Sequence, residues 1–175
     1  MIQEKDTSKG LRQMVWGAIW LTPNGRVGRS PLIIMERDPA KNGYSANSYT
    51  ETLTRGLLPQ YRPGQIFMQD NAPIHNAKYT KDFLEKHGIW TMEWPPYSPD
   101  LNPIEHLWWA LKKLVYKLHP ELATIGGSEE DLKALRKALK EAWKKLPNSL
   151  IRGLIRSMPR RLQAVRKAKG WQTKY

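Results

Sequence analysis

The sequence contains no cysteine, which excludes disulfide bonds and thiolate metal sites. It also lacks an apolar run of the ~18 residues that a membrane-spanning helix needs, and it does not open with a charged segment followed by an apolar one. A glycine-rich phosphate loop, a zinc pattern of Cys and His, a Ser-His-Asp set and internal repeats are missing as well. We therefore expect a protein that neither spans a membrane nor is secreted.

Acidic residues are scarce compared with basic ones. The 175 residues include 29 Lys and Arg against 16 Asp and Glu, which gives a formal net charge of +13 and a pI near 10.0. A field of this sign attracts polyanions and favours nucleic acid as the partner, although a basic solvated surface is the alternative. With 40% apolar residues and 8 Trp, the chain is long enough for one domain with a genuine core.

Hydrophobic periodicity predicts alternating strands and helices. Segments rich in Val, Ile and Trp flank the turn signal of residues 22–25 and predict a β-hairpin over 13–35. The later predicted elements are a helix over 47–58 capped by Asn47 or Ser48, a strand over 65–69, a helix over 76–87 ended by Gly88, a strand over 89–94, a strongly amphipathic helix over 103–118, a helix that begins at Ser128 with Asp131 as capping-box partner, and a last helix that begins near Pro147.

Two carboxylates follow from this pattern as candidate metal ligands. The apolar run 65–69 predicts a short buried strand, so Asp70 falls where the strand ends, which is where α/β folds place their chemistry. Asn102 fits an N-cap and places Glu105 in the first turn of the following helix. If the two side chains converge, they present the hard oxygen ligands that Mg²⁺ and Mn²⁺ prefer.

Each of these candidates has a structural alternative. Asn102 and Glu105 also fit a capping box, in which the glutamate only bonds back to the N–H of the cap. Asp100 is a rival carboxylate that we interpret as a turn residue. His75 is a candidate contact to phosphate, or else a helix-start histidine bonded to backbone. Asn71 either steadies the first carboxylate, contacts phosphate or closes a turn.

The C-terminal part of the chain is dense in basic residues. Such a segment neutralises phosphates without reading sequence, and its binding to nucleic acid weakens steeply with salt. The alternative is a solvated surface helix. The predicted DNA-binding residues are Arg152, Arg156, Arg160, Arg161, Arg166, Lys167 and Lys169.

Four segments, at residues 14–19, 64–75, 94–109 and 157–165, together resemble the catalytic domain of Tc/mariner-type DDE transposases. The resemblance covers nearly the whole chain. It implies an α/β, RNase H-like mixed sheet flanked by helices, in which three acids hold two Mg²⁺ ions that drive DNA strand cleavage and strand transfer. By motif, Asp70 matches the second acid and Glu105 the third. The first acid belongs to a strand upstream of the Trp16 segment, so we expect this chain to begin after it.

The resemblance also implies an organisation of the chain. We expect a frayed segment over 1–12, a partial catalytic core over 13–119 and a basic helical extension over 120–175 that packs on the core. Asp6 is an alternative to the missing acid, but no apolar strand surrounds it. The family's N-terminal helix-turn-helix region is not part of this sequence.

The implied function is metal-dependent phosphodiester cleavage and strand transfer in cut-and-paste DNA transposition. The implied partners are double-stranded DNA, at transposon ends and target, and a second copy in a homodimer; the implied location is the nucleus in a eukaryote and otherwise intracellular. Because two acids hold two ions poorly, we expect the isolated chain to cleave DNA feebly or not at all. The alternatives are a catalytically dead DNA-binding protein and a structural dimerisation domain.

Overall fold

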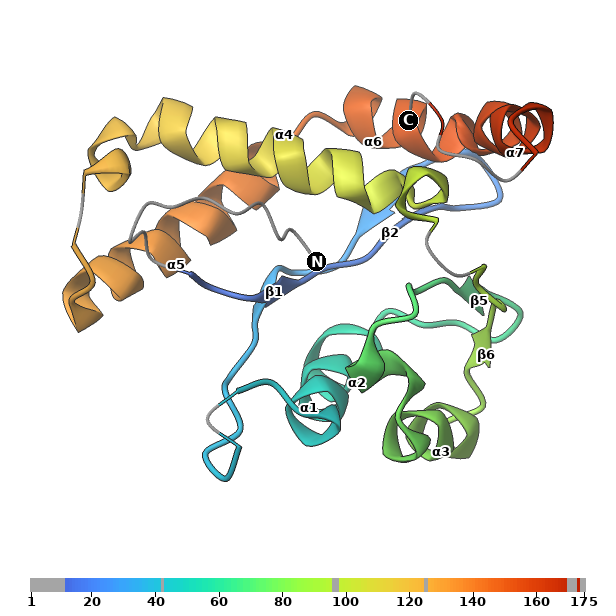
Figure 1. Ribbon diagram of the computed structural model, residues 1–175. Coiled ribbons are helices and arrows are strands. Elements are labelled where there is room, and N and C mark those ends of the chain that lie inside the picture. The colour runs from blue at the N-terminus through green and yellow to red at the C-terminus, as the bar shows by residue number, and fades with distance from the viewer. Residues whose placement is uncertain (1–11, 42, 96–97, 125, 170–172, 174–175) are drawn as a thin grey trace.

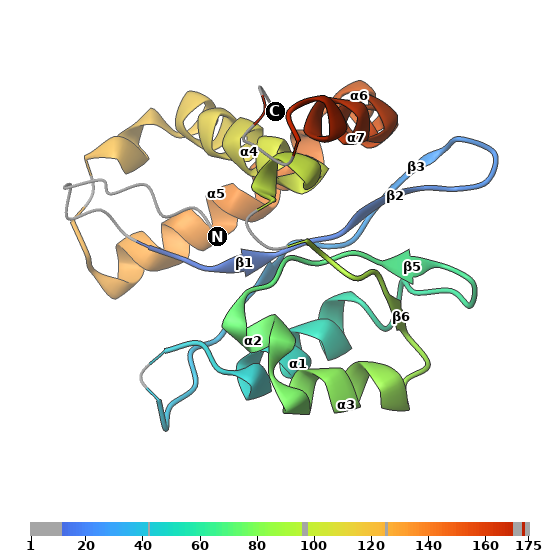
Figure 2. The same ribbon diagram turned by 45° about the vertical axis from the view of Figure 1, so that its right-hand side comes forward.

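A computed structural model describes residues 12–41, 43–95, 98–124, 126–169 and 173. A β-hairpin runs between two groups of helices, with α1 to α3 on one side and α4 to α6 on the other (Figures 1 and 2). The strands are β1 (Val15–Trp16), β2 (Ile19–Leu21), β3 (Val27–Arg29), β4 (Ile33–Ile34), β5 (Ile66–Phe67) and β6 (Trp90–Thr91). The helices are α1 (Ala46–Gly56), α2 (Pro73–Asn76), α3 (Lys78–Lys86), η1 (Pro99–Leu101), α4 (Pro103–Leu118), η2 (Pro120–Ala123), α5 (Glu129–Lys145), α6 (Asn148–Arg156) and α7 (Met158–Lys167).

The predicted hairpin is confirmed. Strand β2 pairs antiparallel with β3, and β1 pairs antiparallel with β4. Between these two ladders the Ala18 N–H donates to Ser30 Oγ at 2.8 Å, which keeps the interrupted strands together. The turn ends at Gly25, whose φ of 76° is a left-handed conformation that glycine adopts at low cost. The hairpin therefore forms from local signals that the sequence carries.

The two faces of the hairpin pack against different cores, as the alternation of side chains along a strand requires. Trp16 packs among the residues of α1 and α3, whereas its neighbour Val15 packs against α4, α5 and α6. Each apolar side chain of that size contributes about 1.5–3 kcal/mol when it is fully buried. The core on the α4 side contains Leu32, Leu107, Leu111, Val115, Leu122, Ala138, Ala142, Trp143, Leu146 and Ile151, and the core on the α1 side contains Trp16, Met35, Tyr49, Leu53, Leu57, Leu84 and Ile89.

The N-cap of α1 differs from the prediction. Ser45 caps this helix, and neither Asn47 nor Ser48 does. Ser48 is the third residue of the helix, and its hydroxyl accepts from the Ser45 N–H at 2.9 Å to complete a capping box. A serine at each end of the box satisfies the same orphan N–H groups as the usual Ser and Glu pair.

Strand β5 is parallel to β6, and helices α2 and α3 make the crossover between them. The prediction of a buried strand over 65–69 was wrong in part, because β5 has two residues and Ile66 is 57% exposed. Within the described ranges β5 pairs only with β6, so the apolar face that Ile66 shares with Trp90 is open. The predicted helix over 76–87 is divided at Ala77, whose ψ of 140° is extended.

Gly88 ends α3 as predicted. Its φ is 63°, and its N–H donates to the Glu85 carbonyl while the Ile89 N–H donates to the Leu84 carbonyl. These two bonds define a Schellman motif, in which the apolar residues before and after the glycine are in contact. Both Leu84 and Ile89 are buried in the α1 core, so the cap directs the chain into β6.

The C-terminal helices begin as the sequence predicts. Asn102 caps α4, and Ser128 caps α5 with Asp131 as its capping-box partner. Arg29 of β3 donates to the carbonyls of Trp143 and Leu146 at 2.7 and 2.8 Å, and also to the side chain of Asn148. A cation at the carbonyl end of a helix also complements the helix dipole.

None of the helices that the structure describes has the length and apolar character that a membrane span requires.

Candidate active site

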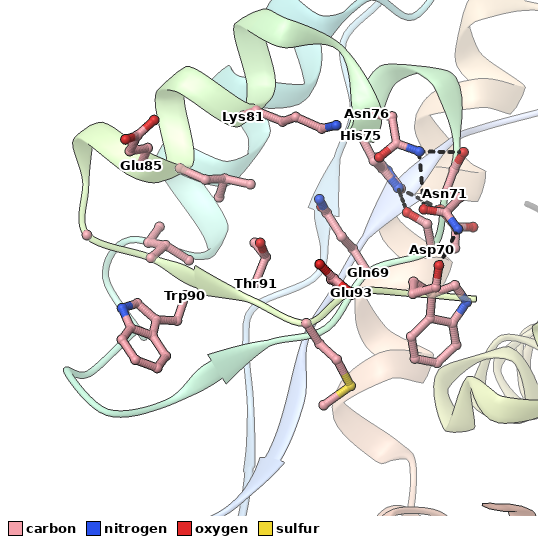
Figure 3. A pocket seen from close by; sticks show the side chains of 15 residues that line it. Gln69, Asp70, Asn71, His75, Asn76, Lys81, Glu85, Trp90, Thr91 and Glu93 are labelled. Carbon is pink, nitrogen blue, oxygen red and sulfur yellow. Dashed lines mark hydrogen bonds and ion pairs between the residues drawn. The ribbon is translucent and has the colours of Figure 1, made fainter. Parts of the chain in front are cut away.

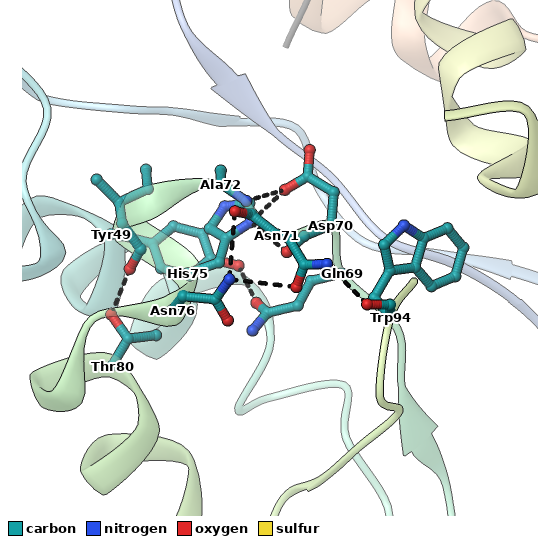
Figure 4. Close-up of polar contacts among 10 residues, drawn as sticks. Tyr49, Gln69, Asp70, Asn71, Ala72, His75, Asn76, Thr80 and Trp94 are labelled. Atoms are coloured by element: carbon teal, nitrogen blue, oxygen red, sulfur yellow. Dashed lines mark hydrogen bonds and ion pairs between the residues drawn. The ribbon is translucent and has the colours of Figure 1, made fainter. Parts of the chain in front are cut away.

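Asp70 lies in the loop between β5 and α2. Its Oδ1 is 2.6 Å from His75 Nδ1 and accepts from the Ala72 N–H at 3.0 Å (Figure 4). The bond from His75 is the main cause that lowers the pKa of Asp70 to about 2, and the Ala72 N–H acts in the same direction. Asp70 is therefore ionised at neutral pH, and its Oδ2 is directed away from these two partners.

The imidazole of His75 is held by hydrogen bonds to Asp70 and by packing against Tyr49. Its Nδ1 is also 3.2 Å from the Asp70 carbonyl, so this nitrogen faces two acceptors and carries the proton. The ring lies against Tyr49, with centroids 4.3 Å apart, and the Tyr49 hydroxyl donates to Gln69 Oε1 at 2.7 Å. Burial raises the pKa of Tyr49, so its hydroxyl stays neutral. The structure thus includes both the backbone bond of the alternative interpretation and a direct bond to the candidate acid.

Asn71 joins two segments that lie far apart in the sequence. Its Nδ2 donates to the Trp94 carbonyl at 2.7 Å, and its Oδ1 accepts from Asn76 Nδ2 at 3.2 Å (Figure 4). The loop that carries Asp70 is thereby fixed to the chain that leaves β6. Asn71 therefore has a structural role, because the partners of its side chain are the Trp94 carbonyl and the Asn76 side chain.

Glu105 lies in the first turn of α4, as predicted. Asn102 Oδ1 accepts from the Ile104 N–H at 3.3 Å, while the Asn102 N–H donates to the Pro99 carbonyl at 2.9 Å. That N–H is the group a capping box would need for Glu105, so the capping-box interpretation is not supported. Burial raises the pKa of Glu105, and the negative charge of Asp70 adds to this effect.

This pair of carboxylates fits part of a divalent metal site. A cation between them would relieve their repulsion and would compensate for the partial burial of Glu105. The part of the chain that the structure describes contains no group of three His, Cys, Asp or Glu side chains able to hold a metal. Among the described residues, Asp70 and Glu105 would therefore supply only two of the donors that a metal site needs.

Asp100 and Arg161 lie behind the first turn of α4. The side chain of Asp100 accepts from Thr173 Oγ1 at 2.8 Å, and its carbonyl accepts from Arg161 Nη1 at 2.6 Å. These bonds agree with the interpretation of Asp100 as a turn residue. Arg161 is only 1% exposed, so its prediction as a DNA contact was wrong: it lies one helical turn after buried Ser157 and faces inward with it. The other six predicted DNA-binding residues, Arg152, Arg156, Arg160, Arg166, Lys167 and Lys169, are exposed.

A pocket of about 680 Å³ adjoins Asp70 between α3 and β6. Gln69, Lys81 and Thr91 point into it, and Asn76 lines its wall (Figure 3). The lining also includes the carboxylates Glu85 and Glu93, so the pocket beside Asp70 carries charges of both signs.

Trp109 is a surface residue that was not among the residues predicted for the site. It is 59% exposed, and Lys113 Nζ lies 3.6 Å from its ring centroid, a cation–π contact. The spacing of Glu105, Trp109 and Lys112 at i, i+4 and i+7 was the available signal, because residues at these positions share a helix face.

Comparisons with known proteins place this chain among transposases in sequence and in fold. The family described as DDE superfamily endonuclease matches residues 33–124. The Tc1 transposase of Caenorhabditis elegans is 38% identical over 162 residues, which are 93% of this chain and 54% of that protein. The Tc3 transposase of the same organism is 36% identical over 116 residues, or 64% of this chain and 33% of that protein. The chain thus spans about half the length of Tc1 transposase and about a third of Tc3 transposase.

Solved structures show the same fold. The catalytic domain of Mos1 mariner transposase superposes with a TM-score of 0.57 at 22% identity, covering 93% of this chain and 82% of that one. The Mos1 paired end complex with Mn gives 0.62 at 22% identity, covering 93% and 46%. The architecture is therefore an RNase H-like mixed α/β fold. This chain belongs to the DDE superfamily of endonucleases, and its relatives within that family are transposases of the Tc1/mariner type.

The bond between His75 and Asp70 predicts a pH dependence. Because the pKa of Asp70 is lowered from 3.8 to about 2 in the folded protein, this carboxylate stabilises the fold at pH values above its unfolded pKa, and that contribution is lost as the pH falls towards 2. Replacing His75 with Ala is expected to move the folded pKa back towards 3.8. A carboxyl-carbon NMR titration of Asp70 measures the change. His87→Ala is the control, since His87 bonds the Phe83 carbonyl; a pKa near 2 in His75→Ala would contradict the assignment.

Proposed function

We propose that this chain is the catalytic part of a Tc1/mariner-type transposase and takes part in metal-dependent cleavage and strand transfer of DNA. The observation that carries the proposal is that Asp70 and Glu105 both lie in segment 33–124, which matches the DDE superfamily endonuclease family. The negative charge of Asp70 also contributes to the raised pKa of Glu105, so the two carboxylates act on each other from separate elements. Two like charges held together in a partly buried site are a common device for binding a cation. The relatives are named as transposases, and a Mos1 structure is named as a strand transfer complex.

The residues of the site have separate roles in this proposal. Asp70 is kept ionised by His75 and offers Oδ2, while Glu105 offers a carboxylate from a helix whose start is fixed by Asn102. Mg²⁺ or Mn²⁺, with which Mos1 structures have been solved, are the ions that oxygen donors favour. When bound as a pair, such ions activate the attacking group and stabilise the leaving oxygen in phosphodiester transfer. The two-ion site requires a further ligand in addition to the two acids.

We propose that the DNA lies across the exposed basic residues of α6 and α7. Their side chains supply charge for the phosphates, and Trp109 with Lys113 extends this surface from the Glu105 turn along α4. Double-stranded DNA at transposon ends is the substrate that the Mos1 complexes suggest. The proposed location of such a protein in a eukaryote is the nucleus, and the proposed assembly is a homodimer.

The proposal is tested by titrating the protein with Mn²⁺ and following the free ion by electron paramagnetic resonance. Glu105→Gln is expected to weaken binding by at least about tenfold, because loss of even an outer partner of a metal ligand costs 10–100-fold. Asp100→Asn is the matched control, since the Asp100 carboxylate accepts from Thr173. The Mn²⁺ affinity of this variant is expected to stay at the wild-type value. Equal affinity for wild type and Glu105→Gln would contradict the proposal.

One observation favours a second candidate function. The exposed basic residues of α6 and α7 are present, whereas a third metal-binding side chain near the acids is not found among the described residues. A transposase-derived protein that only binds DNA would have these features. Such a protein would bind DNA with a steep salt dependence and show no saturable binding of Mn²⁺.

A further inference from the structure

We propose that Arg161 is a positioning residue that holds the Glu105 turn in register with the rest of the site. This inference rests on the proposed function, in which Glu105 is a metal ligand. It also gives a role to the C-terminal segment 157–165, which resembles the family but contains no candidate acid.

The guanidinium of Arg161 reaches three elements at once. Its Nε donates to Ser157 Oγ at 2.7 Å, its Nη1 donates to the Asp100 carbonyl at 2.6 Å, and its Nη2 lies 3.4 Å from His106 Nδ1. Asp100 belongs to η1, which precedes Glu105, and His106 follows Glu105 directly. Arg161 therefore contacts the chain on both sides of the candidate ligand from a helix more than fifty residues later.

The burial of this guanidinium explains why an arginine is needed. A buried charge is costly unless its donors are satisfied, and the planar fork of arginine satisfies several acceptors in fixed directions. Ser157 is buried as well, and its own hydroxyl donates to the Leu154 carbonyl at 2.6 Å, so its oxygen is fixed to accept from Arg161. A lysine would replace this fork with one point charge on a flexible stem.

The bonds of Arg161 restrain the segment that leads into α4. Proline restricts the backbone of this segment at Pro99, and the Asp100 carbonyl accepts the hydrogen bond from Arg161 of α7. Without the Arg161 bonds, η1 loses its hydrogen bond to α7, and the first turn of α4, which presents Glu105, loses support on that side. Displacements of about 1 Å suffice to disrupt a metal or catalytic site.

The test compares Arg161→Met with Arg160→Met, which removes the same charge from an exposed neighbour. Amide hydrogen exchange over residues 99–107 is the first measurement. Loss of hydrogen bonds to a charged group is expected to accelerate exchange there by about 10- to 100-fold in Arg161→Met and to leave Arg160→Met at the wild-type rate. Mn²⁺ affinity is the second measurement and is expected to fall by about tenfold or more in Arg161→Met alone.

A further control separates positioning from general loss of stability. Ile151 is fully buried in the α4 core, and Ile151→Val is expected to cost about 0.5–1.5 kcal/mol without changing either readout at residues 99–107. If Arg161→Met does not fold, Ser157→Ala serves instead, because it removes one bond and keeps the charge. In Ser157→Ala the same acceleration of exchange is expected, and an unchanged rate in the folded variant overturns the proposal.

The two readouts distinguish this inference from the proposed function. Accelerated exchange with no Mn²⁺ binding in the wild type would refute the metal site and with it the positioning role for a ligand. Normal Mn²⁺ binding in the wild type with unchanged exchange and affinity in Arg161→Met would refute the role of Arg161 alone. Arg161→Lys adds a graded comparison, in which partial recovery of Mn²⁺ affinity relative to Arg161→Met is expected and affinity below that of Arg161→Met contradicts the proposal.

Discussion

Replacing Asp70 with Asn is expected to reduce metal-dependent DNA cleavage by the proposed transposase by about 10³-fold. The substitution removes the charge that attracts the cation and leaves an amide where Oδ1 now accepts from His75 and Ala72. A divalent ion contributes several kcal/mol to a phosphoryl transition state, and each 1.36 kcal/mol is a factor of ten in rate. Loss of this one carboxylate charge is therefore expected to lower the cleavage rate by a large factor.

The measurement is nicking of supercoiled plasmid in Mg²⁺ and in Mn²⁺. Asp82→Asn is the control for the same chemical change, because Asp82 is exposed on α3 and pairs with Lys78. Cleavage by Asp70→Asn within a few-fold of the wild-type rate would show that this carboxylate is not a ligand. Cleavage by Asp82→Asn is expected to match the wild type.

Replacing Trp143 with Ala is expected to lower the free energy of unfolding by about 3–5 kcal/mol. The side chain is 2% exposed and stacks on Trp108, with ring centroids 5.4 Å apart. Its ring lies so close to Gly17 that a Cβ there would be 2.9 Å away, and its Nε1 donates to the Ser30 carbonyl at 2.8 Å. The alanine would leave a cavity at the junction of α4, α5 and the hairpin, as well as an unpaired carbonyl.

Urea denaturation followed by circular dichroism measures this change. Trp109→Ala is the matched control, since it removes the same indole from an exposed site where only the cation–π contact with Lys113 is lost. Its expected cost is below about 1 kcal/mol. Equal losses for the two variants would mean that the packing around Trp143 contributes no more than a surface contact.

Features set by neighbours in the chain were predictable from the sequence. The caps at Asn102 and Ser128 need only residues a few positions away, and both are confirmed. The hairpin and the Gly88 cap follow from the same kind of local signal. The positions of Asp70 after a strand and of Glu105 in the first turn of a helix were predictable because strand ends and helix starts are themselves local.

Features set by distant partners were not predictable. The bond from Arg161 to the Asp100 carbonyl spans 61 residues, and no spacing rule distinguishes this arginine from exposed Arg160 beside it. Exposure of Ile66 depends on what covers β5, which the composition of the strand does not specify. The cap at Ser45 was missed because its box partner is a second serine and not an acid.

Arg29 links three elements, because from β3 it bonds the carbonyl end of α5 and the side chain of Asn148 at the start of α6. Helix α6 also packs directly against β2 and β3. A force applied to α6, for example by a duplex bound to its basic residues, would therefore reach the hairpin and, through it, both cores.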